Sequence, residues 1–139
     1  MASTAGNSLF SRTQNCGKII AANIVIQVKD MAKHEFGIMD TAPIPEQTYN
    51  NYEPEKYHCI SVEDKDIEPL LKDFSEILCY WHSLKREEYG LAYCGISIIP
   101  PQSLKNFISI IDNKTQFHEL RDLLQKALQE NKFVIHFGI

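Results

Sequence analysis

The last fifty residues of the chain, 90–139, carry the pattern that most constrains its fold. An apolar run over residues 91–99 reaches the pair Pro100 and Pro101, two amphipathic stretches follow, and residues 133–139 are again mostly apolar. Alternating apolar positions predict strands for the first and last of these segments, and spacings of three and four predict helices for the two between them. We therefore expect strand, helix, helix, strand, with the last strand buried in a sheet.

The residues before position 90 predict two strands, a loop, a short strand and a long helix. The two strands are expected over residues 18–28 and 31–39, and the short strand over residues 56–62. A loop is expected over residues 40–55, because its three prolines are incompatible with a central strand or a helix interior. The helix is expected over residues 66–85, where apolar side chains recur at helical spacing.

This order of elements indicates an α+β fold. We expect a single domain over residues 18–139, preceded by a flexible tail over residues 1–17. The core would be a single mixed β-sheet of about four to five strands, with about three helices packed mainly on one face. A crossover through two helices would make the last two strands parallel.

Charge and composition narrow the class of protein. The formal net charge of −4 disfavours a protein that coats DNA or RNA, and we predict no nucleic-acid partner. Residues 1–17 lack the apolar core of a signal peptide, and the apolar stretches, of about ten residues, are too short to cross a bilayer. The histidines and cysteines form no metal-binding motif. These features predict a cytoplasmic protein with no membrane association, metal or cofactor.

The loop and the residues just after it, 40–57, are the candidate partner-binding segment. They combine carboxylates with tyrosines: Asp40, Glu46, Tyr49, Tyr52, Glu53, Glu55 and Tyr57. Tyrosine offers a rigid contact surface with a hydroxyl group, and acidic neighbours would attract a basic protein. The hypothesis is a small non-enzymatic bacterial binding protein, such as an immunity or antitoxin-like inhibitor. The alternative interpretation of the segment is a solvated connector whose tyrosines pack back onto the core.

Two further hypotheses use other parts of the chain. The first is a small enzyme or ligand-binding domain with a pocket between sheet and helices, lined by Trp81, Tyr93, Ser97 and His136. The second is a homo-oligomeric structural subunit that associates through the first strand, residues 18–28, or through the exposed sheet face. The common phosphate-binding, dinucleotide-binding, zinc-protease and esterase motifs are absent, so no catalytic residue is assigned.

Overall fold

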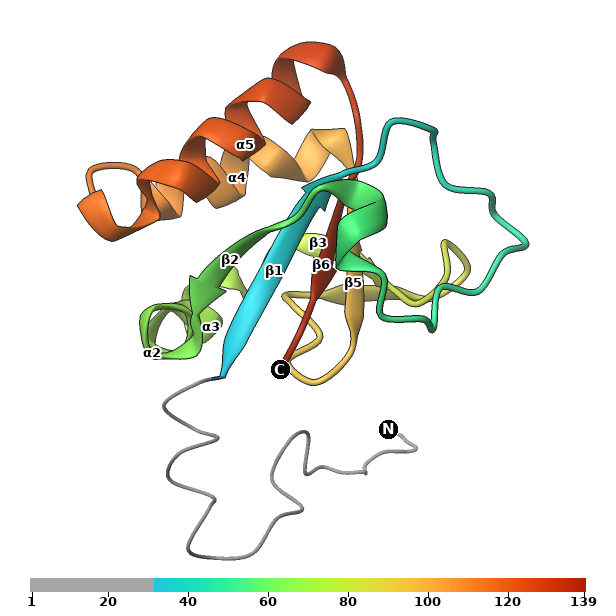
Figure 1. Cartoon of the computed structure of the whole chain (residues 1–139), viewed down its shortest axis with the longest axis horizontal. Helices are drawn as coiled ribbons and strands as arrows, with labels where there is room; N and C mark the ends of the chain where they lie inside the picture. The colour runs from blue at the N-terminus through green and yellow to red at the C-terminus, as the bar shows by residue number, and fades with distance from the viewer. Residues whose placement is uncertain (1–31) are drawn as a thin grey trace, which may run out of the picture.

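The computed structural model describes residues 32–139, and the expected tail and first strand, 1–17 and 18–28, lie outside them. The described chain has an α+β fold built on one six-stranded antiparallel sheet, with strand order β2-β1-β6-β5-β3-β4 (Figure 1). The strands are β1 (Lys33–Ile38), β2 (Ile60–Glu63), β3 (Leu78–Trp81), β4 (Glu87–Tyr89), β5 (Ile96–Ile99) and β6 (Val134–Phe137). The helices are α2 (Asp64–Ile67), α3 (Leu71–Phe74), α4 (Pro101–Ile111) and α5 (His118–Glu130), with single 3-10 turns at η1 (Pro54–Tyr57), η2 (Glu68–Leu70) and η3 (Thr115–Phe117).

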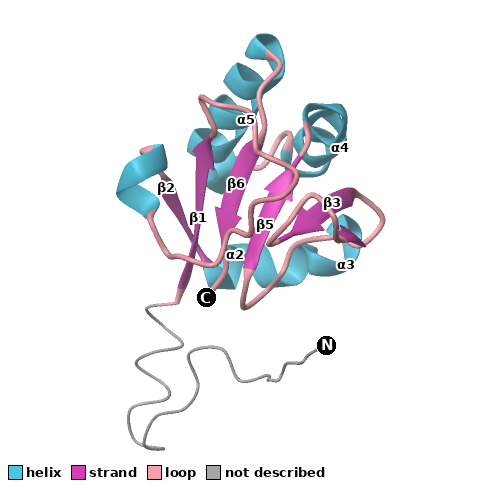
Figure 2. Cartoon of the chain, turned by 90° about the vertical axis from the view of Figure 1, so that its right-hand side faces the viewer, coloured by secondary structure: helices cyan, strands magenta, loops and turns pink. Residues whose placement is uncertain are grey.

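Strand β6 lies in the middle of the sheet, between β1 and β5 (Figure 2). All of its residues are buried, because both faces of the sheet are covered at this point. The expectation that the last strand is buried in a sheet is confirmed. So is the strand expected over residues 31–39, which is β1.

One face of the sheet packs against the helices and forms the larger part of the core. Its buried apolar residues include Ile67 of α2, Phe74 of α3, Leu104 of α4 and Leu124 of α5. Helix α4 begins with a proline, whose missing N–H has no helical acceptor at that position in any case. Helix α5 ends at Glu130, and its C-cap Asn131 adopts the left-handed conformation (φ 57°) that asparagine tolerates better than most residues.

The opposite face carries a second, smaller apolar cluster. Its buried members are Met39, Ile96, Ile98, Ile135 and Phe137. The long connection between β1 and β2 covers this face, since Tyr49 and Tyr57 pack against the cluster. The loop expected over residues 40–55 is therefore present, and it forms a layer of the fold.

The prediction of one long helix over residues 66–85 is wrong. The helical part ends at Phe74, and the chain then turns into β3, which pairs with β4 and β5. Short apolar runs fit either a helix or an interior strand, and here tertiary pairing decides. Cys79 faces the helix-side cluster and Tyr80 the opposite one, so β3 has the alternation of a strand covered on both faces.

The sheet also differs from the prediction in size and in direction. In the described chain it has six strands rather than four to five, because β3 replaces part of the expected helix and β4 forms in the residues just after it. It is antiparallel rather than mixed, and β5 and β6 pair antiparallel despite the two intervening helices. The strand expected over residues 91–99 is confined to β5, because residues 93–95 form a turn. The short strand begins later than expected, at Ile60, because residues 54–57 form η1.

Candidate functional site

The segment 40–57 has exposed acidic side chains on a backbone that is fastened to the sheet. Glu46, Glu53 and Glu55 are exposed. The Asp40 side chain is 81% exposed and contacts Lys132, with Nζ 3.2 Å from Oδ1. Within residues 32–139, no ion pair involves Glu46 or Glu55. Carboxylates held in this way remain available for a basic partner.

One anchor of the loop is a close approach between β1 and the end of η1. Gly37 lies directly beneath Tyr57 and Cys59. A Cβ atom at position 37 would lie 2.7 Å from both the Cβ and the carbonyl oxygen of Tyr57, and 2.8 Å from the Cys59 sulfur. Real Cβ atoms essentially never approach other heavy atoms so closely. The missing side chain of Gly37 therefore lets the loop rest directly on the sheet.

A second anchor joins the middle of the loop to the connection between β3 and β4. The backbone N–H of Tyr49 donates to the His82 carbonyl oxygen at 2.6 Å, and the Nδ1 atom of His82 lies 2.9 Å from the Tyr49 carbonyl oxygen. His82 in turn bonds to Ile96 of β5 through its backbone N–H. Burial lowers the pKa of His82, so its ring is neutral at pH 7 and donates from Nδ1 to the loop.

The loop tyrosines divide between anchoring and exposure. Tyr49 is half-buried, and its hydroxyl oxygen accepts the Ile44 N–H at 3.0 Å. Tyr52 is 63% exposed, although its hydroxyl group donates to Glu35 and its ring meets Phe137 edge-on at 5.4 Å. The hydrogen bond to Glu35 raises the pKa of Tyr52 to about 12. The tyrosines thus pack onto the core, as the connector interpretation describes, while Tyr52 also offers an exposed surface.

A cavity of about 290 Å³ lies between the loop and the end of β1. Its walls include Ile38, Met39 and Ala42, with Tyr49 and Tyr57 beside them. A volume of this size is at the lower limit of ligand pockets, which start near 300 Å³. It is a separate feature from the pocket predicted between sheet and helices.

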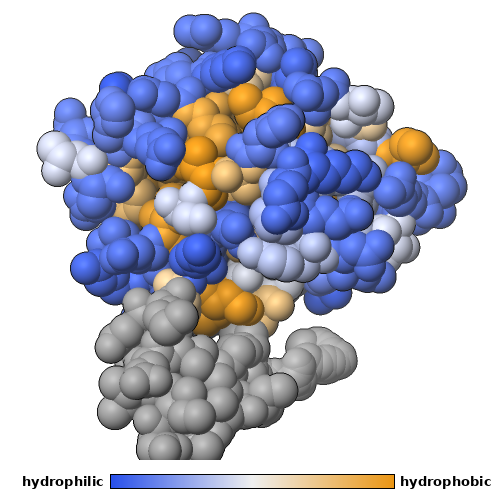
Figure 3. Space-filling model, viewed as in Figure 1, coloured by the Kyte–Doolittle hydropathy of each residue, from blue (hydrophilic) through white to orange (hydrophobic). Residues whose placement is uncertain are grey.

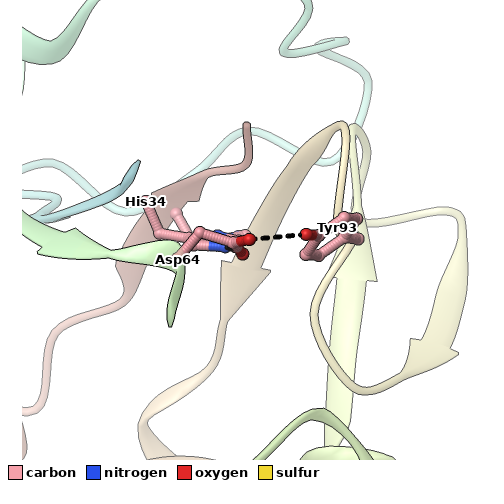
Figure 4. Close-up of polar contacts among 4 residues, drawn as sticks. His34, Asp64 and Tyr93 are labelled. Atoms are coloured by element: carbon pink, nitrogen blue, oxygen red, sulfur yellow. Dashed lines mark hydrogen bonds and ion pairs between the residues drawn. The ribbon is translucent and has the colours of Figure 1, made fainter. Parts of the chain in front are cut away.

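The residues predicted for that pocket lie on the helix side of the sheet, and three of the four belong to one buried polar network. The network links Ser97 of β5, His136 of β6, His34 of β1, Asp64 of α2 and Tyr93, which precedes β5. Its distances are 3.0 Å from Ser97 Oγ to His136 Nδ1, 2.9 Å from His136 Nε2 to His34 Nδ1, 2.8 Å from His34 Nε2 to Asp64 Oδ1, and 2.8 Å from Tyr93 Oη to Asp64 Oδ2. Figure 4 shows Asp64 lying between His34 and Tyr93.

The network has a consistent set of donors and acceptors when both histidines are neutral. Asp64 accepts from Tyr93 and from His34 Nε2–H, which leaves His34 Nδ1 as an acceptor. His136 must then donate from Nε2 and accept at Nδ1. The Ser97 hydroxyl donates to that nitrogen, and its oxygen accepts the backbone N–H of Ala92 at 2.7 Å. Each ring nitrogen and hydroxyl group of the network therefore has a partner, as buried groups require.

Burial maintains this neutral state. His34, Ser97 and His136 are fully buried, and Asp64 is 4% exposed. Burial lowers the pKa of His34, although the hydrogen bond to Asp64 acts in the opposite direction. Burial lowers the pKa of His136 well below its usual value, and the neighbouring His34 adds to the effect. Burial and the hydrogen bond to Asp64 raise the pKa of Tyr93.

This geometry does not make Ser97 an available nucleophile. Its hydroxyl group is sealed from solvent and already bonded on both sides, whereas a nucleophile must face a space where a substrate can sit. Trp81, the fourth predicted pocket residue, lies outside the network: its indole N–H donates to the Gly90 carbonyl at 3.0 Å. The arrangement fits an internal structural link between elements.

His34, Asp64 and His82 were not predicted as site residues. Asp64 is 30 residues from His34, and His136 is 102 residues from it, so no local spacing signals the network. Only the strand pairing places these side chains together. His82 has a positive φ of 65° in the structure, but no sequence pattern predicts that conformation.

Among residues 32–139 we find no group of three or more histidine, cysteine or acidic side chains placed to hold a metal ion. No helix in the same part of the chain has the length and apolar character needed to span a membrane. Comparisons of the chain with protein-family models, with curated proteins and with solved structures give no match in any of the three.

Proposed function

We propose that this chain is a non-enzymatic cytoplasmic binding protein, an immunity or antitoxin-like inhibitor that covers a basic surface of a partner protein with its loop 40–57. The observation that carries the proposal is a loop that is fixed on the sheet while its carboxylates face solvent. A loop ordered in advance loses little conformational entropy when it binds, so more of the contact energy is retained as affinity.

The distribution of charge supports a basic partner. Residues 35–76 contain eleven acidic and three basic side chains, whereas residues 77–139 contain six acidic and seven basic ones. The negative charge is therefore concentrated in the part of the chain that includes β2, α2, α3 and the loop. In Figure 3 the side that carries the loop, on the right of the view, is mainly hydrophilic. Such a surface raises the rate of encounter with a cationic protein, most strongly at low salt.

The test uses the protein encoded by the adjacent gene as the probe. Calorimetry at low and at physiological salt would measure its binding to the full chain. The variant carries Glu46→Lys, Glu53→Lys and Glu55→Lys together. We expect this triple charge reversal to weaken binding by about 100-fold, because each position changes from attraction to repulsion.

A matched variant with Glu87→Lys, Glu119→Lys and Asp122→Lys undergoes the same change in net charge on β4 and α5, at exposed positions with no ion pair to the loop. We expect less than a threefold loss of affinity for this control. Absence of binding to the adjacent gene product, or equal losses for both triple variants, would contradict the proposal. Light scattering of the free protein at several concentrations tests the alternative that its partner is a second copy of the same chain.

A further inference from the structure

The buried polar network joins parts of the chain that are distant in sequence. His34 and His136 belong to neighbouring central strands, and Asp64 is the first residue of α2, directly after the edge strand β2. Through Asp64 the network ties the turn that opens α2 to the middle of the sheet. The backbone N–H of Asp64 also donates to the Ala32 carbonyl at 3.0 Å, so this turn is held at two points.

A first added proton disturbs the network without breaking it. On His34 the proton would occupy Nδ1, and His136 would have to change tautomer so that Nε2 accepts. His136 would then donate from Nδ1 to Ser97, whose oxygen already accepts the Ala92 N–H. The Ser97 hydroxyl hydrogen would be left without its acceptor. Asp64 would face the new charge from α2 and offset part of its cost.

A second added proton is incompatible with the observed geometry. Both histidines would then be cations with N–H groups on the two nitrogens that now lie 2.9 Å apart. The groups facing the pair are Asp64 from α2 and Tyr93 and Ser97 from the segment around β5, with Glu68 of η2 acting on Tyr93. A single carboxylate in contact does not balance two buried charges.

We propose that the network is an acid-sensitive latch, closed while both histidines are neutral, and that protonation releases residues 60–74 from the sheet. The latch is a property of the fold and does not depend on the function proposed for the loop. Release removes Val62 and Asp64 from beside His34 while β1 and β6 stay paired, and complete unfolding frees both rings. Because these open states bind protons that the closed latch excludes, their population rises as the pH falls below about 6.5, the ordinary histidine pKa. Each excluded proton changes an opening equilibrium by up to tenfold per pH unit, so one proton changes release by up to about tenfold and two protons change unfolding by up to about 100-fold per unit.

Long-range nitrogen NMR spectra of the full chain between pH 8 and pH 5 test the closed state directly. We expect Nε2–H tautomers for both His34 and His136, with neither ring titrating while the fold is intact. The exposed His58 and His118 serve as internal references for the chemical shifts in the same spectra. An Nδ1–H tautomer on either buried ring, or titration of both near pH 6.5 in the folded protein, would overturn the proposal.

Amide hydrogen exchange, corrected for its intrinsic pH dependence, tests the open state. Between pH 7 and pH 5 we expect protection over residues 60–74 to fall at least tenfold more than protection in α4 and α5. Equal loss in all of these segments, or no loss, would refute local release. His136→Gln should remove up to one proton from the pH dependence of unfolding. If His136→Gln does not fold, the wild-type spectra and exchange data still decide the question.

Discussion

The fit between Gly37 and the loop makes a quantitative prediction for Gly37→Ala. The new methyl group would lie 2.7 Å from two atoms of Tyr57 and 2.8 Å from the Cys59 sulfur. An ordinary contact needs at least 3.4 Å, so η1 would have to move by more than half an ångström, and part of what must move is backbone. Overpacking of this kind costs roughly 1–3 kcal/mol, and the lower entropy of an unfolded alanine offsets about 0.5–1 kcal/mol of it.

The net expectation for Gly37→Ala is a loss of about 1–2 kcal/mol in the free energy of unfolding. Urea unfolding followed by tryptophan fluorescence would measure it, and the melting temperature should fall by roughly 4–8 °C. Addition of Cys59→Ala removes one of the close contacts and should restore part of the loss. Ser61→Ala on the edge strand is the control and should change stability by less than about 0.5 kcal/mol.

The same variant tests whether the loop is held by the sheet. In Gly37→Ala the amide resonances of residues 54–59 should shift, and the Tyr49 contact with His82 should weaken. A variant as stable as the wild type, with these resonances unchanged, would show that the loop does not rest on Gly37 as described.

Three other variants or reagents test separate parts of the fold. Leu104→Ala should lower the free energy of unfolding in urea by about 2–5 kcal/mol because the side chain is fully buried, whereas Lys105→Ala next to it should lower it by less than about 0.5 kcal/mol. A small effect for Leu104→Ala would mean that α4 does not pack against the sheet through this residue. Gly138→Ala should lower the free energy of unfolding by about 2–4 kcal/mol, because the methyl group would overlap the Tyr93 carbonyl oxygen and displace two backbone hydrogen bonds. An unchanged melting temperature would argue against this packing. Burial raises the pKa of Cys79 to about 12, so this thiol should react with maleimide at pH 8 only as fast as the protein unfolds. Peptide mass spectrometry would measure the rate of labelling, and rapid labelling of the folded protein would show that Cys79 is not buried.

The C-terminal part of the fold could be predicted from sequence because its signals are local. Pro101 opens α4, Asn131 closes α5, and the apolar face of each helix recurs at regular spacing. The last strand follows with no competing interpretation. Each of these features depends on residues a few positions apart, which is the range over which a sequence pattern is informative.

The region between residues 66 and 90 could not be assigned in the same way. The spacing of Phe74, Ile77, Leu78 and Trp81 fits a helical stripe, yet Leu78–Trp81 pairs with two strands and buries side chains on both faces. Pairing with Ile98 and Ser97 depends on residues almost twenty positions away. Local periodicity contains no information about such partners, so the tertiary structure overrides it.

The candidate site was also predictable only where its signals are local. The acidic loop was visible in the sequence, because composition alone marks it, but its two attachments to the sheet were not. Tyr93, Ser97 and His136 were predicted to line a pocket, and the structure places them in one buried hydrogen-bond network. The missing members, His34 and Asp64, join only through the register of β1 with β2 and β6.

The central place of β6 has a consequence for how the protein forms in the cell. In the described chain, strands β2 and β1 on one side, and β5, β3 and β4 on the other, share no direct strand pairing, and β6 (Val134–Phe137) is the strand that joins them into one sheet. During translation the two halves cannot pair into one sheet until residues 134–137 have left the ribosome, and their apolar edges stay uncovered until then. A chain stalled or cleaved before it would be a natural target for chaperones and proteases, because neither half can complete the sheet without it.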